Sequence, residues 1–381
     1  MTRHMRYDEL TWPDVAALPR DMPLILPLGD GYDQTRVADM VGAPAQIGWL
    51  PPVPFGWRGS GLAVPEPILG AMVSNLLLSL RDDGFSRVYA LTPQGIDLGL
   101  GALQLMAPHA DNRHAQPPTP PAADAGKVVL IPIGHTEQHG YHLPLQTDTV
   151  IIDAVMTATQ ARVPEQATLL PVFPYGVSTH RTAFAGTLNC GGRAFEDFWL
   201  AVVDLLVARG FDRIYFNSGH GGNCSFLVTV VKYAGERHRR IFCATTWLHT
   251  SGDVGAAALA AHRVSGRGGM GHAGELETAM MLHLRPALCH MARVVDEIDF
   301  VTTPNYYMDW IEGGALVANP PWEDDTVTGA YGAGSVATAA HGARWLEAAI
   351  AEKVSHVQEI HQQQQLREAR RTSGFGRWSA Q

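Results

Sequence analysis

The chain has 381 residues, of which 46% are hydrophobic and 17% are charged, a balance typical of a globular protein with a sizeable core. Its formal net charge of −9 argues against a nucleic-acid partner, because nucleic-acid-binding surfaces are basic. No apolar run approaches the roughly 20 residues that a membrane span needs, so we expect no membrane partner. The N-terminus lacks the apolar stretch of a secretory signal, and the four cysteines form no Cys-x-x-Cys pair, so we predict a cytoplasmic location.

The first hundred residues alternate short apolar strands with helices. Residues 23–29 and 84–91 are apolar runs that predict strands, and residues 68–81 between them predict an apolar helix. Residues 51–56 are rich in proline and predict a rigid loop. A unit this short cannot bury a full core by itself, so we expect it to pack on the rest of the chain.

The same order of segments returns later in the chain. Three ordered pairs of segments match: 26–29 with 131–134, 51–56 with 171–176, and 84–89 with 210–215. We interpret residues 1–106 as a truncated, degenerate copy of the unit that follows; the alternative is a chance likeness between two α/β stretches. The copy is predicted to be free of metal, because it has Gly31-Tyr-Asp-Gln34 where the second unit has Glu137 and His139, and Gln94 where the second unit has His220.

Residues 107–126 are rich in proline and alanine, which predicts an extended linker. They divide the first unit from a second at residues 127–355, and residues 356–381 are expected to be the end of a long helix and a tail. In the second unit, strand, helix and strand follow one another with short links, the pattern of a parallel α/β sheet. Residues 298–330 show little periodicity and predict a long loop that helps to wall a site.

Ionisable residues gather where the apolar strands of the second unit end. After the apolar run 127–131 come Glu137, His139 and Asp148, and the first two project to the same side of an extended segment. Two carboxylates and an imidazole suit a divalent metal such as zinc, manganese or iron. The alternative is a polar surface loop that carries acidic residues and histidines by chance.

Two later stretches favour the metal. The predicted strand 211–216 ends in Asn217-Ser-Gly-His-Gly-Gly-Asn223, where glycines let the backbone of His220 approach a ligand closely. Further on, Gly271-His-Ala-Gly-Glu-Leu-Glu-Thr278 places His272, Glu275 and Glu277 before an apolar run. Three ionisable clusters, each at the edge of an apolar segment, are hard to explain as solvated surface.

These stretches, in this order over about residues 127–355, resemble the creatininase (creatinine amidohydrolase) family of metal-dependent amidohydrolases. The motifs that carry the resemblance are Gly134 to Asp148, Asn217 to Asn223 and His272 to Thr278. The resemblance implies a three-layer α/β/α sandwich with a mostly parallel sheet and a site at the carboxyl ends of its strands. Because relatives are often hexamers, it also implies a homo-oligomer.

The resemblance implies a site for two divalent metal ions that share Asp148 and acidify a bridging water. Glu137, Asp148 and His220 would hold one ion, and His139 and Asp148 the other. Creatininase has a further glutamate where this chain has Gly222. Either Glu275 or Glu277 could replace it; we place Glu275 among the metal ligands and Glu277 with His272 in the catalytic group. His272 matches the family histidine that moves the proton.

The stretches 176–180 and 184–187 resemble a substrate-contacting segment of the family and make Ser178 and His180 candidate substrate contacts. The predicted function is hydrolysis of a non-peptide C–N bond in a small amide, lactam or formamide through the bridging hydroxide. The missing glutamate argues against creatinine itself. Two alternatives remain, a peptidase-like protein that trims a modified peptide, and a non-catalytic binding or scaffold protein.

Overall fold

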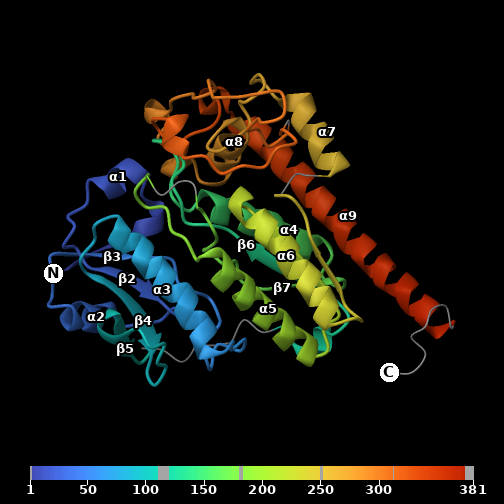
Figure 1. The fold of residues 1–381 in the computed structure, drawn as a ribbon, viewed down its shortest axis with the longest axis horizontal. Coiled ribbons are helices and arrows are strands. Elements are labelled where there is room, and N and C mark those ends of the chain that lie inside the picture. The colour runs from blue at the N-terminus through green and yellow to red at the C-terminus, as the bar shows by residue number, and fades with distance from the viewer. Residues whose placement is uncertain (1, 110–119, 180–182, 249–251, 312, 374–381) are drawn as a thin grey trace.

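The chain forms two units that lie side by side, each built on a parallel β-sheet (Figure 1). The computed structural model describes residues 2–109, 120–179, 183–248, 252–311 and 313–373. In the first unit the strand order is β1-β3-β2-β4-β5. The strands are β1 (Arg3–Arg6), β2 (Leu24–Pro27), β3 (Gln46–Trp49), β4 (Val88–Pro93) and β5 (Gln104–Ala107), and the helices are α1 (Trp12–Ala16), α2 (Gln34–Met40) and α3 (Glu66–Asp82).

The second unit carries a four-stranded parallel sheet of order β7-β6-β8-β9. Its strands are β6 (Val128–Ile133), β7 (Ala167–Leu169), β8 (Arg213–Ser218) and β9 (Phe242–Thr245). Its helices are α4 (Thr147–Arg162), α5 (Gly192–Ala208), α6 (Gly221–Arg237), α7 (Asp253–His262), α8 (Glu275–Leu284) and α9 (Ala339–Thr372). Between α8 and α9 the described chain forms loops and short 3₁₀ turns, as predicted for residues 298–330.

Helices cover both faces of the second sheet, which confirms the predicted three-layer α/β/α sandwich. Val128 and Leu130 of β6 belong to a core cluster with residues of α4 and α9. Val129 and Ile131, on the opposite face of the same strand, pack with residues of α5 and α6. Every residue of β6 is buried, as expected for a central strand of a parallel sheet with two covered faces.

Four strands of the first sheet, β3-β2-β4-β5, stand in the same order as β7-β6-β8-β9 in the second. The pairs follow the internal repeat seen in the sequence, and β1 is an additional edge strand. The shared order agrees with a duplication, which stays a prediction, as does the linker, since residues 110–119 lie outside the described residues. The first sheet reaches Ala107, one residue beyond the predicted boundary.

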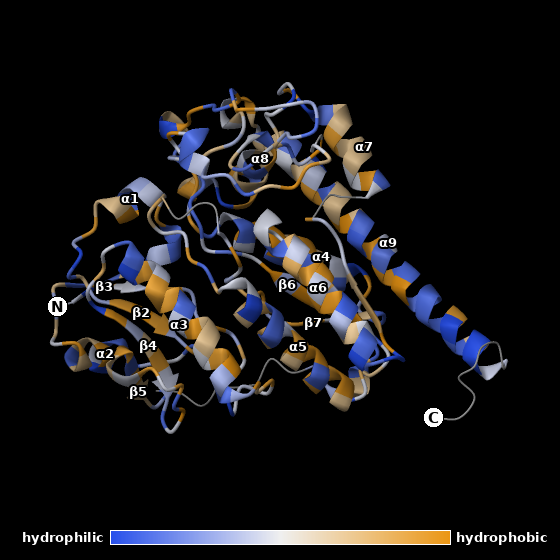
Figure 2. Cartoon of the chain, in the orientation of Figure 1, coloured by the Kyte–Doolittle hydropathy of each residue, from blue (hydrophilic) through white to orange (hydrophobic). Residues whose placement is uncertain are grey.

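The two units share one hydrophobic core. Phe55 of the first unit is fully buried, with its ring centroid 5.5 Å from that of Phe173 and 6.2 Å from that of Phe198 in the second unit. Helix α3 packs against α5 across the same boundary. Figure 2 shows the hydrophobic residues concentrated on the strands of both sheets, whereas the C-terminal end of α9 is hydrophilic. The first unit therefore completes the core of the second.

The described helices include none that is long and apolar enough to cross a lipid bilayer.

Truncating the shared aromatic contact should destabilise the whole chain. We expect Phe55→Ala to lower the free energy of unfolding by about 3–5 kcal/mol, because it removes a large buried ring and leaves a cavity. Leu78→Ala, at a side chain of α3 that is 53% exposed, is the control and should change it by less than about 0.5 kcal/mol. Urea unfolding followed by tryptophan fluorescence measures both. A loss below about 1 kcal/mol for Phe55→Ala would contradict a shared core.

Candidate metal centre

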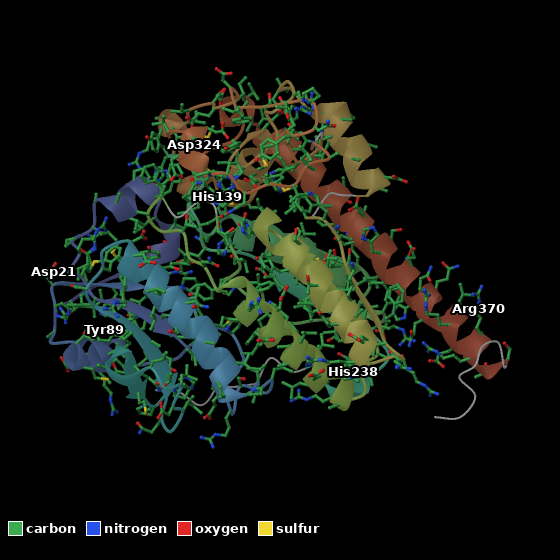
Figure 3. The ribbon with its side chains drawn as sticks, in the orientation of Figure 1. Asp21, Tyr89, His139, His238, Asp324 and Arg370 are labelled. Atoms are coloured by element: carbon green, nitrogen blue, oxygen red, sulfur yellow. The ribbon has the colours of Figure 1, made fainter. Side chains whose placement is uncertain are left out.

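The ionisable residues predicted from the sequence meet at the carboxyl ends of β6 and β8. Beyond β6 the chain crosses to α4 and carries Glu137 and His139 in the crossing and Asp148 in the first turn of that helix. His220 follows β8 as the N-cap residue of α6. In parallel α/β sheets this edge is where ligands bind. Figure 3 places His139 between the second sheet and the loops that precede α9.

Asp148 lies between two histidines and turns one carboxylate oxygen toward each. Its Oδ1 is 3.1 Å from His139 Nε2, and its Oδ2 is 3.3 Å from His220 Nδ1. Glu137 Oε1 lies 2.9 Å from the same His220 nitrogen. All four side chains are at most 1% exposed. Asp148 therefore offers one oxygen to each of two imidazoles within the same buried cluster.

Backbone carbonyls fix the orientation of three histidine rings. His139 Nδ1–H donates to Glu137 O (3.1 Å), His220 Nε2–H to Val177 O (2.9 Å) and His272 Nε2–H to Gln138 O (2.7 Å). The second nitrogen of each ring faces the carboxylates, at 2.9–3.9 Å. Metal-binding histidines are oriented in this way, with one nitrogen donating to a carbonyl and the other left for the ion. The residues present therefore fit divalent metal ions.

The histidines and carboxylates shift one another's pKa values. Burial alone would lower the pKa of His220, but the charges of Glu137 and Asp148 outweigh it and raise the pKa to about 9. Burial likewise opposes the charged form of Asp148, yet His139 and His220 hold the pKa of that carboxyl well below its usual range. Buried carboxylates need such positive partners. Divalent ions would take the place of the histidine protons as those partners.

The structure separates the two glutamates of α8. Glu277 Oε2 lies 3.7 Å from His139 Nε2, and Glu277 forms a potential metal-binding group with His139 and Asp148. Glu275 is buried elsewhere, where its carboxylate accepts hydrogen bonds from the backbone N–H groups of Val264 and Ser265 at 2.7–3.2 Å. The placement of Glu275 among the metal ligands is therefore corrected, and Glu277 is the carboxylate beside His139.

Gly222, at which the resemblance leads us to expect a glutamate, leaves no room for a side chain. A Cβ atom there would lie 2.4 Å from His220 Nε2 and 2.3 Å from Val177 O, the two atoms that orient the His220 ring. A glutamate at this position would displace the hydrogen bond on which His220 depends. Glu277 reaches the cluster from α8, with its Oε2 beside His139 Nε2.

His272 lies at the edge of the cluster. Its Nδ1 is 3.7 Å from Glu137 Oε1 and 3.9 Å from Glu277 Oε2, and its ring stands edge-on to Trp322 at 5.1 Å between centroids. The next residue, Ala273, has φ of +54°, an uncommon conformation for a residue with a side chain, and its N–H donates to Glu277 Oε2 at 2.6 Å. This turn thus holds both His272 and Glu277 in place.

Two further histidines surround the cluster. His135, which the sequence analysis missed, is fully buried and forms a group with Glu137 and His220. Its Nδ1 accepts a hydrogen bond from Gly176 N–H (2.9 Å), which puts the proton of the neutral ring on Nε2. The signal for it was the alternation of His135, Glu137 and His139, which puts all three on one side of an extended segment. His142 belongs to none of the potential metal-binding groups among the described residues, and its Nε2 lies 2.9 Å from Thr278 Oγ1.

A cavity of about 620 Å³ opens beside the cluster. It extends from Gly222, next to His220, to Trp322, which packs on His272. Six aromatic residues line it: Phe226, Trp247, Tyr306, Tyr307, Trp310 and Trp322. Among the described lining residues there is no lysine or arginine. Residues 306–322 supply much of the wall, in agreement with the role predicted for the 298–330 loop.

Of the two candidate substrate contacts, Ser178 lies within the described residues. Ser178 is fully buried, and its hydroxyl has no hydrogen-bond partner among the described residues. It follows Val177, which orients His220, and so a substrate group near His220 could use this hydroxyl. His180 lies outside the described residues. The structure therefore keeps Ser178 as a candidate substrate contact and leaves His180 a prediction.

The fold and the cluster define a three-layer α/β/α protein with a buried histidine–carboxylate centre of metal-binding composition. Residues 112–357, well over half of the chain, match the creatininase family, described as creatinine amidohydrolase. The chain belongs to the creatininase family.

Relatives and solved structures agree with this assignment. The chain is 36% identical over 165 residues to a mycofactocin precursor peptide peptidase of Mycobacterium ulcerans, covering 42% of this chain and 58% of that protein. It is 26% identical over 185 residues to a creatinine amidohydrolase of Pseudomonas putida, covering 44% and 68%. A solved creatininase shares the fold, with a TM-score of 0.54 and 23% identity over 63% of this chain and 92% of that one. The chain thus spans less than two thirds of the peptidase it matches.

Glutamine substitutions should distinguish the two glutamates. We expect Glu277→Gln to retain about one metal ion fewer per chain after dialysis, because a neutral amide binds a divalent cation far more weakly than a carboxylate. Glu275→Gln, a change of the same size two residues away, should retain the full complement. Elemental analysis of both purified variants measures this. The opposite pattern would return Glu275 to the ligand set.

Metal affinity should rise with pH. In the metal-free protein the raised pKa of His220, about 9, keeps its ring protonated at neutral pH, whereas metal binding requires the neutral ring. Below pH 9 an ion must displace this proton, so we expect the affinity for zinc to fall up to about tenfold per pH unit between pH 8 and 6.5. Competition with a chelator measures it. The same shift makes the metal-free protein lose stability as the pH rises from 6.5 through 9. An affinity that does not change over this range would contradict the proton displacement.

Proposed function

We propose that the protein hydrolyses an amide C–N bond with two divalent ions, zinc, manganese or iron, held by Glu137, His139, Asp148, His220 and Glu277. The observation that carries the proposal is Asp148, whose two oxygens face two different oriented histidines. Bound ions would supply a Lewis acid for the carbonyl and a water acidified enough to act as a nucleophile. A related solved structure is described as a manganese creatininase, which supports a divalent metal.

The residues of this chain supply orientation and proton transfer. His272 keeps its Nε2 proton on Gln138 O, so its Nδ1 is the atom that takes the proton of the attacking water and passes it to the leaving nitrogen. Glu277 lies 3.9 Å from the same nitrogen and stabilises the ring when it is charged. Trp322 packs on the ring and excludes water from one side.

The cavity favours a large amide over a small ring. A volume of about 620 Å³ lies in the range of pockets that enclose drug-sized ligands, and creatinine or a formamide would fill little of it. Its aromatic walls without a cationic side chain favour an uncharged, apolar or aromatic group. Together with the peptidase relatives, this supports the peptidase-like alternative, in which the end of a modified peptide occupies the cavity. A small lactam or formamide is the second candidate.

A substrate comparison tests the proposal. Metal-loaded protein is incubated with short peptides that end in an aromatic or aliphatic residue, and with creatinine, lactams and formamides, and released amine is measured. We expect turnover of the peptides. Trp310→Ala should raise KM for the aromatic peptide and leave formamide turnover unchanged. Protein that binds no transition metal and turns over none of these compounds would favour the non-catalytic scaffold.

Removing the proton carrier should separate catalysis from metal binding. We expect His272→Ala to keep both metal ions and to lower kcat about 10²–10⁴-fold, the usual contribution of general acid–base catalysis. Elemental analysis and steady-state kinetics measure the two effects. Because Glu137, His139 and His272 also form a potential metal-binding group, loss of an ion from His272→Ala would make His272 a ligand instead.

The homo-oligomer and the cytoplasmic location remain predictions from the sequence. Analytical ultracentrifugation of the full chain tests the oligomer directly.

A further inference from the structure

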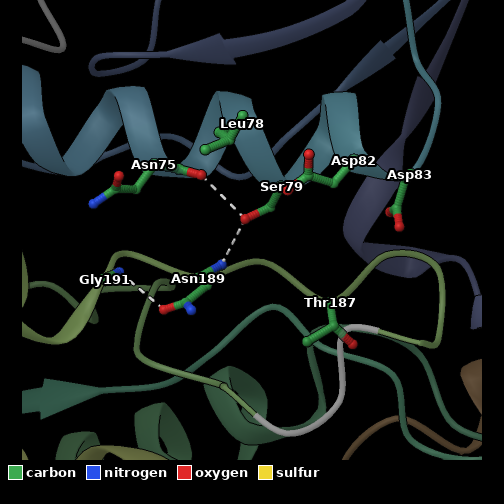
Figure 4. Close-up of a pocket in the computed structure, with 8 residues that line it drawn as sticks. All are labelled: Asn75, Leu78, Ser79, Asp82, Asp83, Thr187, Asn189 and Gly191. Atoms are coloured by element: carbon green, nitrogen blue, oxygen red, sulfur yellow. Dashed lines mark hydrogen bonds between the residues drawn. The ribbon is translucent and has the colours of Figure 1, made fainter.

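Three polar side chains, two in the C-terminal half of α3 and one at its C-cap, reach from the first unit to one segment of the second. Asn75 Nδ2 donates to Cys190 O (2.7 Å), Ser79 Oγ accepts from Asn189 N–H (3.1 Å) and Asp83 Oδ2 accepts from Gly186 N–H (2.7 Å). Residues four apart project from the same face of a helix. A small cavity of about 180 Å³ is lined by residues of α3 and of this segment. Figure 4 shows the bond from Asn189 to Ser79 among those residues.

The opposite side of the same segment bonds the backbone of the metal centre. Leu188 N–H donates to Thr136 O at 3.0 Å, and Gln138 N–H donates to Thr187 Oγ1 at 3.2 Å. Thr136 and Gln138 are the two neighbours of Glu137. Residues 184–191, here termed the bridging segment, therefore lie between α3 and the metal centre and bond to both.

The hydrogen bonds that begin at α3 continue through Gln138 to His272. Gln138, whose N–H is held by the bridging segment, accepts the Nε2 proton of His272 on its own carbonyl at 2.7 Å. A shift of the Gln138 backbone would change the position of Glu137 and the orientation of His272 together. A metal ligand and the proposed proton carrier thus depend on one peptide segment.

A second set of contacts ties the first unit to the next metal ligand. Leu145 N–H donates to Leu10 O (2.9 Å), and Gln146 N–H donates to Asp8 O (3.0 Å). These donors stand three and two residues before Asp148. Leu145 O in turn accepts from Glu137 N–H at 3.1 Å. The first unit therefore contacts the backbone around both carboxylates that face His220.

We propose that the first unit, whose own sequence lacks the metal-binding residues, acts as an intrachain positioning element for the metal centre. Asn75, Ser79 and Asp83 are its positioning residues, and they act through the bridging segment on Glu137 and His272. Apolar packing between α3 and α5 would be enough to hold the two units together. Hydrogen bonds depend on direction, so bonds on both sides of the bridging segment also fix its orientation. The kinetic part of this inference rests on the proposed function; the metal-binding part does not.

The test uses the full chain with Ser79→Ala and Asp83→Ala combined. Two controls match it: Ser74→Ala, an exposed serine on the same helix, and Asp83→Asn, whose amide oxygen can still accept from Gly186. Amide hydrogen exchange at residues 134–139, zinc affinity by chelator competition, and kcat and KM are measured at a temperature where all variants are folded. If the double variant does not fold, Ser79→Ala is measured alone.

We expect faster exchange at residues 134–139, zinc binding weaker by about tenfold or more, as for other residues that support metal ligands, and normal values in both controls. With a substrate in hand, kcat should fall about tenfold with little change in KM, since a misplaced catalytic group slows the reaction more than binding. Faster exchange in the bridging segment with unchanged exchange at 134–139 and unchanged zinc affinity would overturn the inference. Absence of any turnover in the wild-type protein would contradict the proposed function. The positioning role of the first unit would still be tested by hydrogen exchange and zinc affinity.

Discussion

Three carboxylates buried against histidines are the constraint on which this structure depends. Glu137, Asp148 and Glu277 are at most 2% exposed, and a buried carboxylate is costly unless a positive charge or hydrogen-bond donor faces it. The fold supplies His139, His220 and His272 as those partners and fixes each ring on a backbone carbonyl. Because the carbonyls belong to the chain around the cluster, the orientation of the ligands follows from the path of the backbone.

The path of the backbone accounts for two close-packed glycines and one strained residue near the cluster. Gly134 leaves β6 where a Cβ atom would lie 2.3 Å from Thr149 Oγ1, so the chain can pass close to the first turn of α4 and bring Glu137 near Asp148. Gly222 leaves space for the bond between His220 and Val177 O. Ala273 adopts an unfavourable φ and directs its N–H at Glu277. One strained residue and two close approaches therefore lie where the histidines and carboxylates are held, as is common at functional sites.

The two units contribute differently to the protein. Both have parallel sheets with the same order of four strands, yet the residues that could bind a metal gather in the second unit among the described parts of the chain. The first unit contributes Phe55 to a common core and the polar side chains of α3 to the bridging segment. The first unit therefore forms part of the surroundings of the histidine–carboxylate cluster in the second.

The sequence by itself determined the sheet type, the order of the ionisable clusters and most of the centre. Apolar strands that end in polar residues bring those residues to one edge of a parallel sheet whatever the packing details, so Glu137, His139, Asp148 and His220 could be found from spacing alone. Tertiary structure alone places Glu277 beside His139 and Glu275 against the backbone of Val264 and Ser265. Two residues apart in one helix turn, they point in nearly opposite directions, and only the packing of α8 on α9 and α4 sets which one faces the site. The bridging segment also depended on tertiary structure, because contacts such as that of Gly186 with Asp83 join residues about a hundred positions apart, and no local pattern encodes them.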